Sequence, residues 1–301
     1  MSDQTRQSFL QRLNNLTRSA TSLRARMRKG FRNATPQAEA APKLVTPLAV
    51  TRKTNAPAGQ CLYAIGDIHG RCDLLERLIL QIEEDAGNLP DGTTVTIVFL
   101  GDYIDRGLQS RDVIDFLLSD RMNPFERVFL MGNHEEALLR FMNEVSFGKQ
   151  WVRYGGAETL YSYGLQPPNS RVSLDSHEAM EAVQRAWDKV WTDFRQRLPE
   201  THLKFFQSLQ HYYIAGDYLF VHAGLRPGSA LEQQTVRDML WIRDEFLDAS
   251  EQFPQMVVHG HTPEDSIHHD NRRIGLDTGA FISGKLSAAR LFQDEVTFLS
   301  T

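Results

Sequence analysis

Five short apolar runs recur along this chain, and each is followed within three residues by glycine together with Asp, Asn or His. The runs occupy positions 61–65, 95–100, 128–131, 218–221 and 256–258. Runs of about 4 to 8 β-favouring residues next to glycine are typical of buried strands. Between the first three runs the apolar positions instead repeat at helical spacing, at Leu74, Leu75, Leu78, Ile79 and Ile82, and again at Val113, Ile114, Leu117 and Leu118. This change of period predicts βαβ units in an α/β fold.

The polar residues that follow the runs form five motifs in chain order. They are Gly66-Asp67-Ile68-His69-Gly70, Gly101-Asp102-Tyr103-Ile104-Asp105-Arg106-Gly107, Gly132-Asn133-His134-Glu135, Val221-His222-Ala223-Gly224 and Val258-His259-Gly260-His261-Thr262-Pro263. One such motif alone could be a turn or a helix N-cap. In open α/β sheets, however, ligands bind beyond the carboxyl ends of the strands, so five motifs in this position predict one shared crevice.

The side chains in these motifs are of the kinds that bind divalent metals. Carboxylate, amide and imidazole groups without a thiolate suit Mn, Fe or Zn. Asp67, His69 and Asp102 can hold one ion, and Asp102 can bridge to a second. The other ligands of the second ion are Asn133, His222 and His261. Two ions about 3.5 to 4 Å apart stabilise the attacking and leaving oxygens of an in-line displacement and convert bound water to hydroxide near neutral pH. Four positive charges against two carboxylates and one hydroxide leave a net charge that attracts a phosphoryl dianion.

Other motif residues match the needs of phosphoryl transfer. Arg106 and Arg243 can clamp phosphate oxygens, because the guanidinium fork matches their geometry. His134 is then available as general acid for the departing alkoxide, a role that typically contributes about a hundred- to ten-thousand-fold. Asp105 is its expected orienting partner, which fixes the ring and stabilises the imidazolium.

At these residues the chain resembles the calcineurin-like metallophosphoesterases, within them the phosphoprotein phosphatase branch that contains the Ser/Thr phosphatases and the phage lambda phosphatase. The match runs from about residue 60 to 300, and the stretch 151–164 is similar to prokaryotic and phage-type members. The resemblance implies a four-layer β-sandwich, in which two mixed sheets are flanked by helices. It implies the same two metal-ligand sets, and phosphate contacts from Arg106, Arg243 and Asn133.

The leading interpretation is a metal-dependent phosphomonoester hydrolase, a Ser/Thr protein phosphatase with two divalent ions. Mn²⁺ is the expected metal, and Fe or Zn also suits the ligands. A bridging hydroxide attacks phosphorus in line, and His134 protonates the leaving group. One alternative is a symmetrical dinucleotide polyphosphate or RNA-cap pyrophosphohydrolase, with which the Asp105-Arg106 pair is equally compatible. A more distant alternative is a non-catalytic adaptor, which the loss of a ligand would favour, and no ligand is lost here.

Several residues near the motifs have two interpretations. His259 precedes His261 by two positions and could share its face, so strand geometry leaves it open as a ligand; the resemblance favours a packing role. Glu135 could cap the helix that starts near His134, or support the site. Trp187, Trp191 and Phe194 lie at helical spacing, which favours core packing over a substrate platform.

Charge divides the chain into two parts. Residues 1–57 hold eleven Lys or Arg against two acidic residues, a net of +9, whereas the remainder holds 22 basic against 36 acidic residues. Within this tail Leu10, Leu13, Leu16, Leu23, Met27 and Phe31 predict a basic amphipathic helix, followed by a Pro- and Ala-rich linker over 34–59. Such a helix docks on an anionic membrane surface, nucleic acid or a partner protein, or is a solvated basic arm against the acidic body. In a eukaryotic protein it would also suit an organellar transit peptide. The catalytic domain is expected over 58–301.

The remaining stretches refine this picture. A helical insert is expected over about 147–210, with helices near 178–197 and 200–210, where it would overhang the metal site. Later strands are expected over 266–274, 275–280, 286–292 and 295–299, in the second sheet. Two cysteines form no disulfide framework, and the sequence has neither a transmembrane nor a secretory apolar run, which predicts a cytoplasmic protein. No motif for nucleic acid is present.

Overall fold

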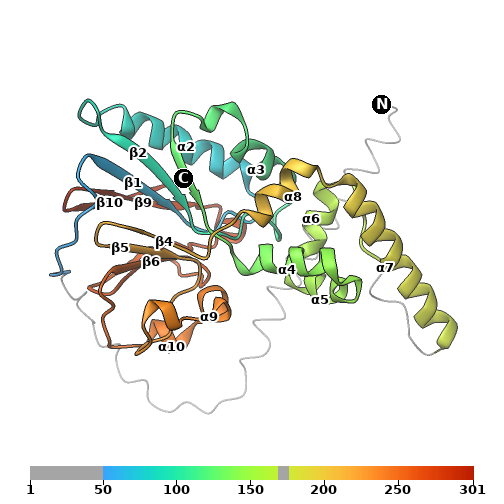
Figure 1. Cartoon of the computed structure of the whole chain (residues 1–301). Coiled ribbons are helices and arrows are strands. Elements are labelled where there is room, and N and C mark those ends of the chain that lie inside the picture. Colours follow the sequence, from blue (N-terminus) through green and yellow to red (C-terminus); the bar gives the residue numbers. More distant parts are fainter. Residues whose placement is uncertain (1–49, 169–175) are drawn as a thin grey trace, which may run out of the picture. The chain divides into compact units, whose positions relative to one another are not determined.

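Two five-stranded mixed sheets face each other in the computed structural model, which describes residues 50–168 and 176–301 (Figure 1). The first sheet has the order β10-β9-β1-β2-β3, built from β1 (Gln60–Ile65), β2 (Thr94–Phe99), β3 (Glu126–Phe129), β9 (Ser287–Phe292) and β10 (Glu295–Ser300). The second has the order β4-β5-β6-β8-β7, built from β4 (Tyr212–Ala215), β5 (Tyr218–Val221), β6 (Met256–His259), β7 (His268–His269) and β8 (Arg273–Gly275). Strands β1, β2 and β3 run parallel, as do β5, β6 and β8.

Helices cover the outer face of each sheet. α2 (Cys72–Ala86) and α3 (Ser110–Leu117) pack on the first sheet, and α9 (Val236–Trp241) and α10 (Asp244–Leu247) pack on the second (Figure 1). A third apolar cluster fills the space between the sheets, where Leu62, Val98 and Phe220 are fully buried. This arrangement confirms the predicted four-layer α/β sandwich.

The predicted helical faces are largely confirmed. α2 buries Leu74, Leu75, Leu78, Ile79 and Ile82, the residues that the helical spacing selects. α3 buries Val113, Ile114 and Leu117, but Leu118 is 42% exposed because the helix ends at Leu117.

The predicted insert is helical and packs around its own aromatic core. It follows α4 (Asn133–Asn143) and contains α5 (Gly148–Trp151), a π-helical turn (Val152–Gly156), α6 (Ala157–Ser162), α7 (His177–Arg197) and α8 (Glu200–Gln207). Short 3₁₀ turns lie at Asp120–Met122, Val145–Phe147 and Leu231–Gln233. Trp187 and Phe194 contact Phe141 and are buried, and the Trp191 indole donates to the Phe141 carbonyl. These residues are therefore core, as the sequence predicts.

Two predictions for the C-terminal region are wrong. The stretch 275–280 leaves β8 and turns, because Asp277 Oδ1 accepts a hydrogen bond from the amide of Gly279, whose φ of 66° is left-handed. A short helix, α11 (Ala280–Ser283), follows. The last hairpin joins the first sheet, not the second, since β9 pairs antiparallel with β1. Its small residues Ala288 and Ala289 fit between apolar clusters on both faces.

The amphipathic helix predicted in the tail lies outside the described residues. Contacts with the second sheet begin at Thr51, whose amide donates to Asn271 Oδ1. The Thr54 hydroxyl then donates to the Tyr218 hydroxyl at 2.8 Å in a buried contact. No helix within the described ranges is long and apolar enough to cross a bilayer.

Candidate metal centre

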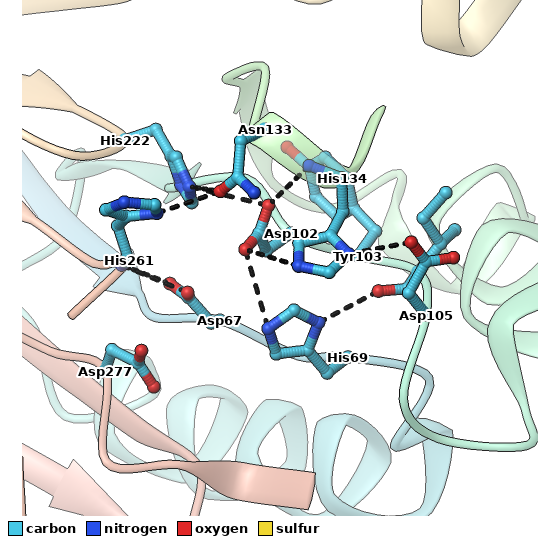
Figure 2. A network of polar contacts seen from close by, with 12 residues as sticks. Asp67, His69, Asp102, Tyr103, Asp105, Asn133, His134, His222, His261 and Asp277 are labelled. Atoms are coloured by element: carbon cyan, nitrogen blue, oxygen red, sulfur yellow. Dashed lines mark hydrogen bonds and ion pairs between the residues drawn. The ribbon is translucent and has the colours of Figure 1, made fainter. Parts of the chain in front are cut away.

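The predicted site residues meet at the carboxyl ends of β1, β2, β5 and β6 and at the start of α4 (Figure 2). Their backbone is strained there. Among the described residues, six non-glycine residues have a left-handed φ, and five of these are His69, Asp102, Asp105, Arg106 and His261. Such strain clusters where the fold fixes functional side chains at sharp turns.

Asp102 lies at the centre of the site, and each of its two carboxylate oxygens faces a different group of side chains. Its Oδ2 is 3.5 Å from His69 Nε2, and its Oδ1 is 3.4 Å from His222 Nε2 (Figure 2). Two sets of potential ligand atoms result, each within 4.8 Å of one another: one from His69, Asp102 and His134, the other from Asp102, His222 and His261. Asp102 belongs to both sets, and its two oxygens face different sets.

Two imidazoles of the site, those of His69 and His222, are held so that Nε2 faces Asp102. Nδ1 of His69 lies 2.9 Å from the Ile104 carbonyl, and Nδ1 of His222 lies 2.9 Å from the Leu100 carbonyl. A ring that donates through Nδ1 keeps a lone pair on Nε2 for a metal. Burial lowers the pKa of the His69 and His222 rings below its usual value. It lowers the pKa of His261 to about 2, so all three rings are neutral near pH 7.

Asn133 joins the second group, as predicted. Its Oδ1 lies 2.9 Å from His222 Nε2 and 2.8 Å from His261 Nδ1. Because the Nδ1 proton of His222 is directed at Leu100, its neutral Nε2 presents a lone pair to this oxygen and to Asp102 Oδ1. Three lone-pair donors that converge in this way repel one another until a cation lies between them.

Asp67 contacts the backbone of the loop that carries His261. Both its oxygens accept from the amide of His261, at 3.1 and 3.0 Å, and Asp67 is not a member of either ligand cluster. The carboxylate keeps further lone pairs that are free to bind a metal ion. Beside it lies another buried carboxylate, Asp277, which was not among the predicted site residues (Figure 2). Burial and the neighbouring carboxylates raise the pKa of Asp67, and burial raises that of Asp277 to about 6. Gly260 makes room here, since a Cβ on it would lie 2.0 Å from Asp67 Oδ1.

These groups fit divalent metal ions. Three buried ring nitrogens in the described part of the chain have no hydrogen-bond partner and belong to this site: Nε2 of His69, His134 and His261. Unpaired buried polar atoms are costly, and a metal ion beside Asp102 would satisfy Nε2 of His69. Nitrogen and oxygen donors without a thiolate suit borderline to hard divalent ions.

His134 has the environment of an acid that is kept protonated. Its Nδ1 lies 2.7 Å from Asp105 Oδ2, while its Nε2 lies 3.9 Å from Asp102 Oδ2 and has no hydrogen bond. Burial lowers the pKa of this ring, but Asp102 and Asp105 outweigh it, and the pKa is raised above the usual value. Asp105 thus makes the contact with the His134 ring that the orienting role requires.

Two residues of the insert support Asp105, and the sequence reasoning missed both. The Trp151 indole donates to Asp105 Oδ2 at 2.9 Å, and the Thr159 hydroxyl donates to Asp105 Oδ1 at 2.6 Å. All three residues are buried. Two residues of the insert thus hold the Asp105 carboxylate, which in turn contacts the His134 ring.

Glu135 combines the two roles that the sequence left open. Its carboxylate accepts from the amide of Gly132 at 3.0 Å, which is the N3-to-N-cap half of a capping box at the start of α4. It also accepts from the amides of Asp102 and Tyr103 at 2.9 Å. Glu135 therefore fixes the left-handed turn that carries the bridging carboxylate.

The two arginines lie in loops of the site. Arg243 Nη1 donates to the His261 carbonyl at 3.2 Å and to Thr262 Oγ1 at 3.1 Å. The guanidinium carbon of Arg106 lies 5.0 Å from the centre of the Phe281 ring. His259 turns away from the ligand clusters: its Nδ1 contacts the Gly260 carbonyl and its Nε2 contacts Arg273. His259 therefore packs behind the site.

Comparison with known proteins agrees with this geometry. The family model of calcineurin-like phosphoesterases matches residues 62–284. An asymmetrical bis(5'-nucleosyl)-tetraphosphatase, PrpE of Anoxybacillus flavithermus, is 26% identical over 250 residues, which cover 75% of this chain and 88% of that protein. A PP2A-like serine/threonine-protein phosphatase, PPG1 of Candida albicans, is 49% identical over 104 residues, or 34% of this chain and 23% of that protein.

A solved structure assigned to a diadenosine tetraphosphatase shares the fold, with a TM-score of 0.50 and 20% identity, over 82% of this chain and 98% of that one. The family match spans well over half of the chain and includes both metal-ligand groups. The chain therefore belongs to the calcineurin-like phosphoesterase family and is a metallophosphoesterase.

Proposed function

We propose that this metallophosphoesterase removes phosphate from phosphoserine or phosphothreonine in proteins. The observation that supports this proposal is the His134–Asp105 pair, a buried imidazole held by a carboxylate at 2.7 Å with its other nitrogen open to the site. A serine or threonine alkoxide is a poor leaving group and departs only with a proton. A general acid in this position supplies that proton.

The other residues take the roles that the motifs predict. Asp67, His69 and Asp102 hold one ion, and Asp102, Asn133, His222 and His261 hold the second. Mn²⁺ is the proposed metal, with Fe and Zn as alternatives. When bound, two such ions polarise a phosphoryl oxygen and lower the pKa of a water molecule. Arg106, Arg243 and Asn133 bind the remaining phosphate oxygens, and Glu135 keeps the Asp102 turn in register.

Parallel substrates test this proposal. Metal-stripped protein, reconstituted with Mn²⁺, is given a phosphothreonine peptide and diadenosine tetraphosphate at equal concentration. The proposal predicts a higher kcat/KM for the peptide. A higher kcat/KM for the dinucleotide contradicts it and favours the second candidate below.

The second candidate is hydrolysis of dinucleoside polyphosphates, and two observations favour it. The similarity to PrpE spans 75% of this chain, whereas the similarity to PPG1 spans 34%. In addition, a cavity of about 640 Å³ lies along α4, lined by Phe147, Tyr154 and Trp241 and by Arg140 and Arg237.

This cavity adjoins the metal centre and has suitable chemistry for a nucleotide. The Trp241 ring lies 6.2 Å from the His261 ring, centre to centre. Aromatic faces stack on nucleobases, and arginines match phosphate oxygens. The products distinguish two modes of cleavage: AMP with ATP from asymmetrical attack, and two ADP from the symmetrical attack that the sequence analysis expected.

The basic tail carries a separate proposal. We propose a cytoplasmic protein whose tail holds it at an anionic membrane surface. Replacing Arg24, Arg26 and Arg28 by Ser in the full chain is expected to abolish co-sedimentation with phosphatidylserine vesicles at low salt. Unchanged co-sedimentation would rule the tail out as the membrane contact.

A further inference from the structure

The guanidinium of Arg106 lacks a hydrogen-bonded protein partner. Its backbone amide donates to the Gly155 carbonyl at 3.0 Å, but its side chain makes no hydrogen bond or ion pair within residues 50–168 and 176–301. Arg243 differs, because its Nη1 donates to two oxygens of the His261 loop. What Arg106 has instead is an aromatic ring, that of Phe281, 5.0 Å from its guanidinium carbon.

The Phe281 ring is carried by a turn that is fixed at both ends. Gly279 and Gly284 flank α11, with left-handed φ values of 66° and 73°. The amide of Gly279 is held by Asp277, and the carbonyl of Ala280 accepts from Arg71 Nη1 at 3.0 Å. The ring is partly buried and meets His69 edge to face, with 5.4 Å between ring centres. Its position is therefore set by the fold.

We propose that Phe281 is a positioning residue for phosphate binding, which orients the Arg106 guanidinium by a cation–π contact. The inference rests on the proposed function, because it takes Arg106 as a phosphate ligand. A carboxylate in the same place would also orient an arginine, but it would occupy N–H groups that the phosphate needs. An aromatic face contacts the guanidinium without accepting its in-plane N–H groups, so these groups stay available to substrate.

The aliphatic part of the Arg106 side chain is also confined by Gly155, a residue of the insert. A Cβ on residue 155 would lie 2.7 Å from Arg106 Cγ, so only glycine leaves this space open. Gly155 also has a φ of 113°, which other residues rarely adopt. Backbone on one side and the Phe281 ring on the other thus restrict the side chain before substrate arrives, which reduces the entropy lost on binding.

The test measures phosphate recognition with a small substrate, so it does not depend on the physiological one. The Mn²⁺-loaded full chain is assayed with 4-nitrophenyl phosphate, and the Ki of inorganic phosphate as competitive inhibitor is determined. Phe281→Leu keeps the apolar bulk but removes the ring, and it is expected to raise Ki by about two- to thirty-fold, the range of cation–π contacts. Phe281→Tyr is expected to restore it. Ile282→Ala, on the same turn and 79% exposed, is the matched control with unchanged Ki.

Coupling to Arg106 separates this role from a general structural one. In an Arg106→Ala background, Phe281→Leu is expected to have no further effect on Ki, because the contact is already absent. An equal loss in both backgrounds, a loss of bound metal in Phe281→Leu, or an unchanged Ki overturns the inference. An unchanged Ki in Arg106→Ala alone contradicts the phosphate-binding role itself, and with it the inference.

Discussion

Replacement of His134 by Asn tests the chemistry proposed for this site. The substitution removes the imidazole whose Nδ1 lies 2.7 Å from Asp105 Oδ2 and leaves the neighbouring ligand Asn133 in place. A positioned general acid contributes about a hundred- to ten-thousand-fold, or about 3 to 5.5 kcal/mol of barrier. We therefore expect kcat on a phosphothreonine peptide to fall by this factor.

The loss is expected to depend on the leaving group. Threonine alkoxide needs a proton to depart, whereas 4-nitrophenolate leaves without one. Hence kcat on 4-nitrophenyl phosphate is expected to fall by less than about tenfold, since only the acid role is lost. The assay compares kcat of wild type and His134→Asn on both substrates, with metal content measured for each protein.

Equal losses on the two substrates, with metal content unchanged, would refute the general-acid role. They would mean that His134 acts on binding or on metal geometry. A role in metal geometry is physically distinct from proton transfer, because His134 also belongs to a ligand cluster with His69 and Asp102. A fall in bound metal in the variant would point to the same conclusion.

Three further predictions concern neighbours of this pair and the metal groups. Asp105→Asn removes a carboxylate that raises the pKa of His134; the active acid is the protonated ring, so the alkaline limb of the kcat–pH profile should move to lower pH. An unmoved limb would contradict this. Asp102→Ala should abolish binding of both ions, and two tightly bound ions in metal analysis would disprove the bridge. Gly260→Ala should lower both metal content and the Tm, because its Cβ would lie 2.0 Å from Asp67 Oδ1; wild-type values for both would show that the loop can shift.

The sequence predicted the centre of the site well, for a physical reason. His222 follows an apolar run directly, and Asp102 and Asn133 follow theirs after a single glycine. The ends of neighbouring strands coincide in any open α/β sheet. Their meeting needs no knowledge of distant contacts. The sequence also pointed to Asp105, because a motif residue next to a candidate acid has few other roles.

Residues that act across long sequence distances were missed. Trp151 and Thr159 reach Asp105 from the insert, and no local pattern marks either as a site residue. Phe281 follows a turn that was predicted as strand. The last hairpin was assigned to the wrong sheet for the same reason: alternating apolar residues indicate a strand but not which neighbour it pairs with.

Metal stoichiometry coupled to turnover tests the central claim most directly. Metal-stripped protein is titrated with Mn²⁺ by calorimetry, and phosphate release from a phosphothreonine peptide is followed at each metal ratio. The structure predicts two ions per chain, and turnover that rises only as the second group fills. Full turnover with a single ion per chain would contradict a two-metal centre bridged by Asp102.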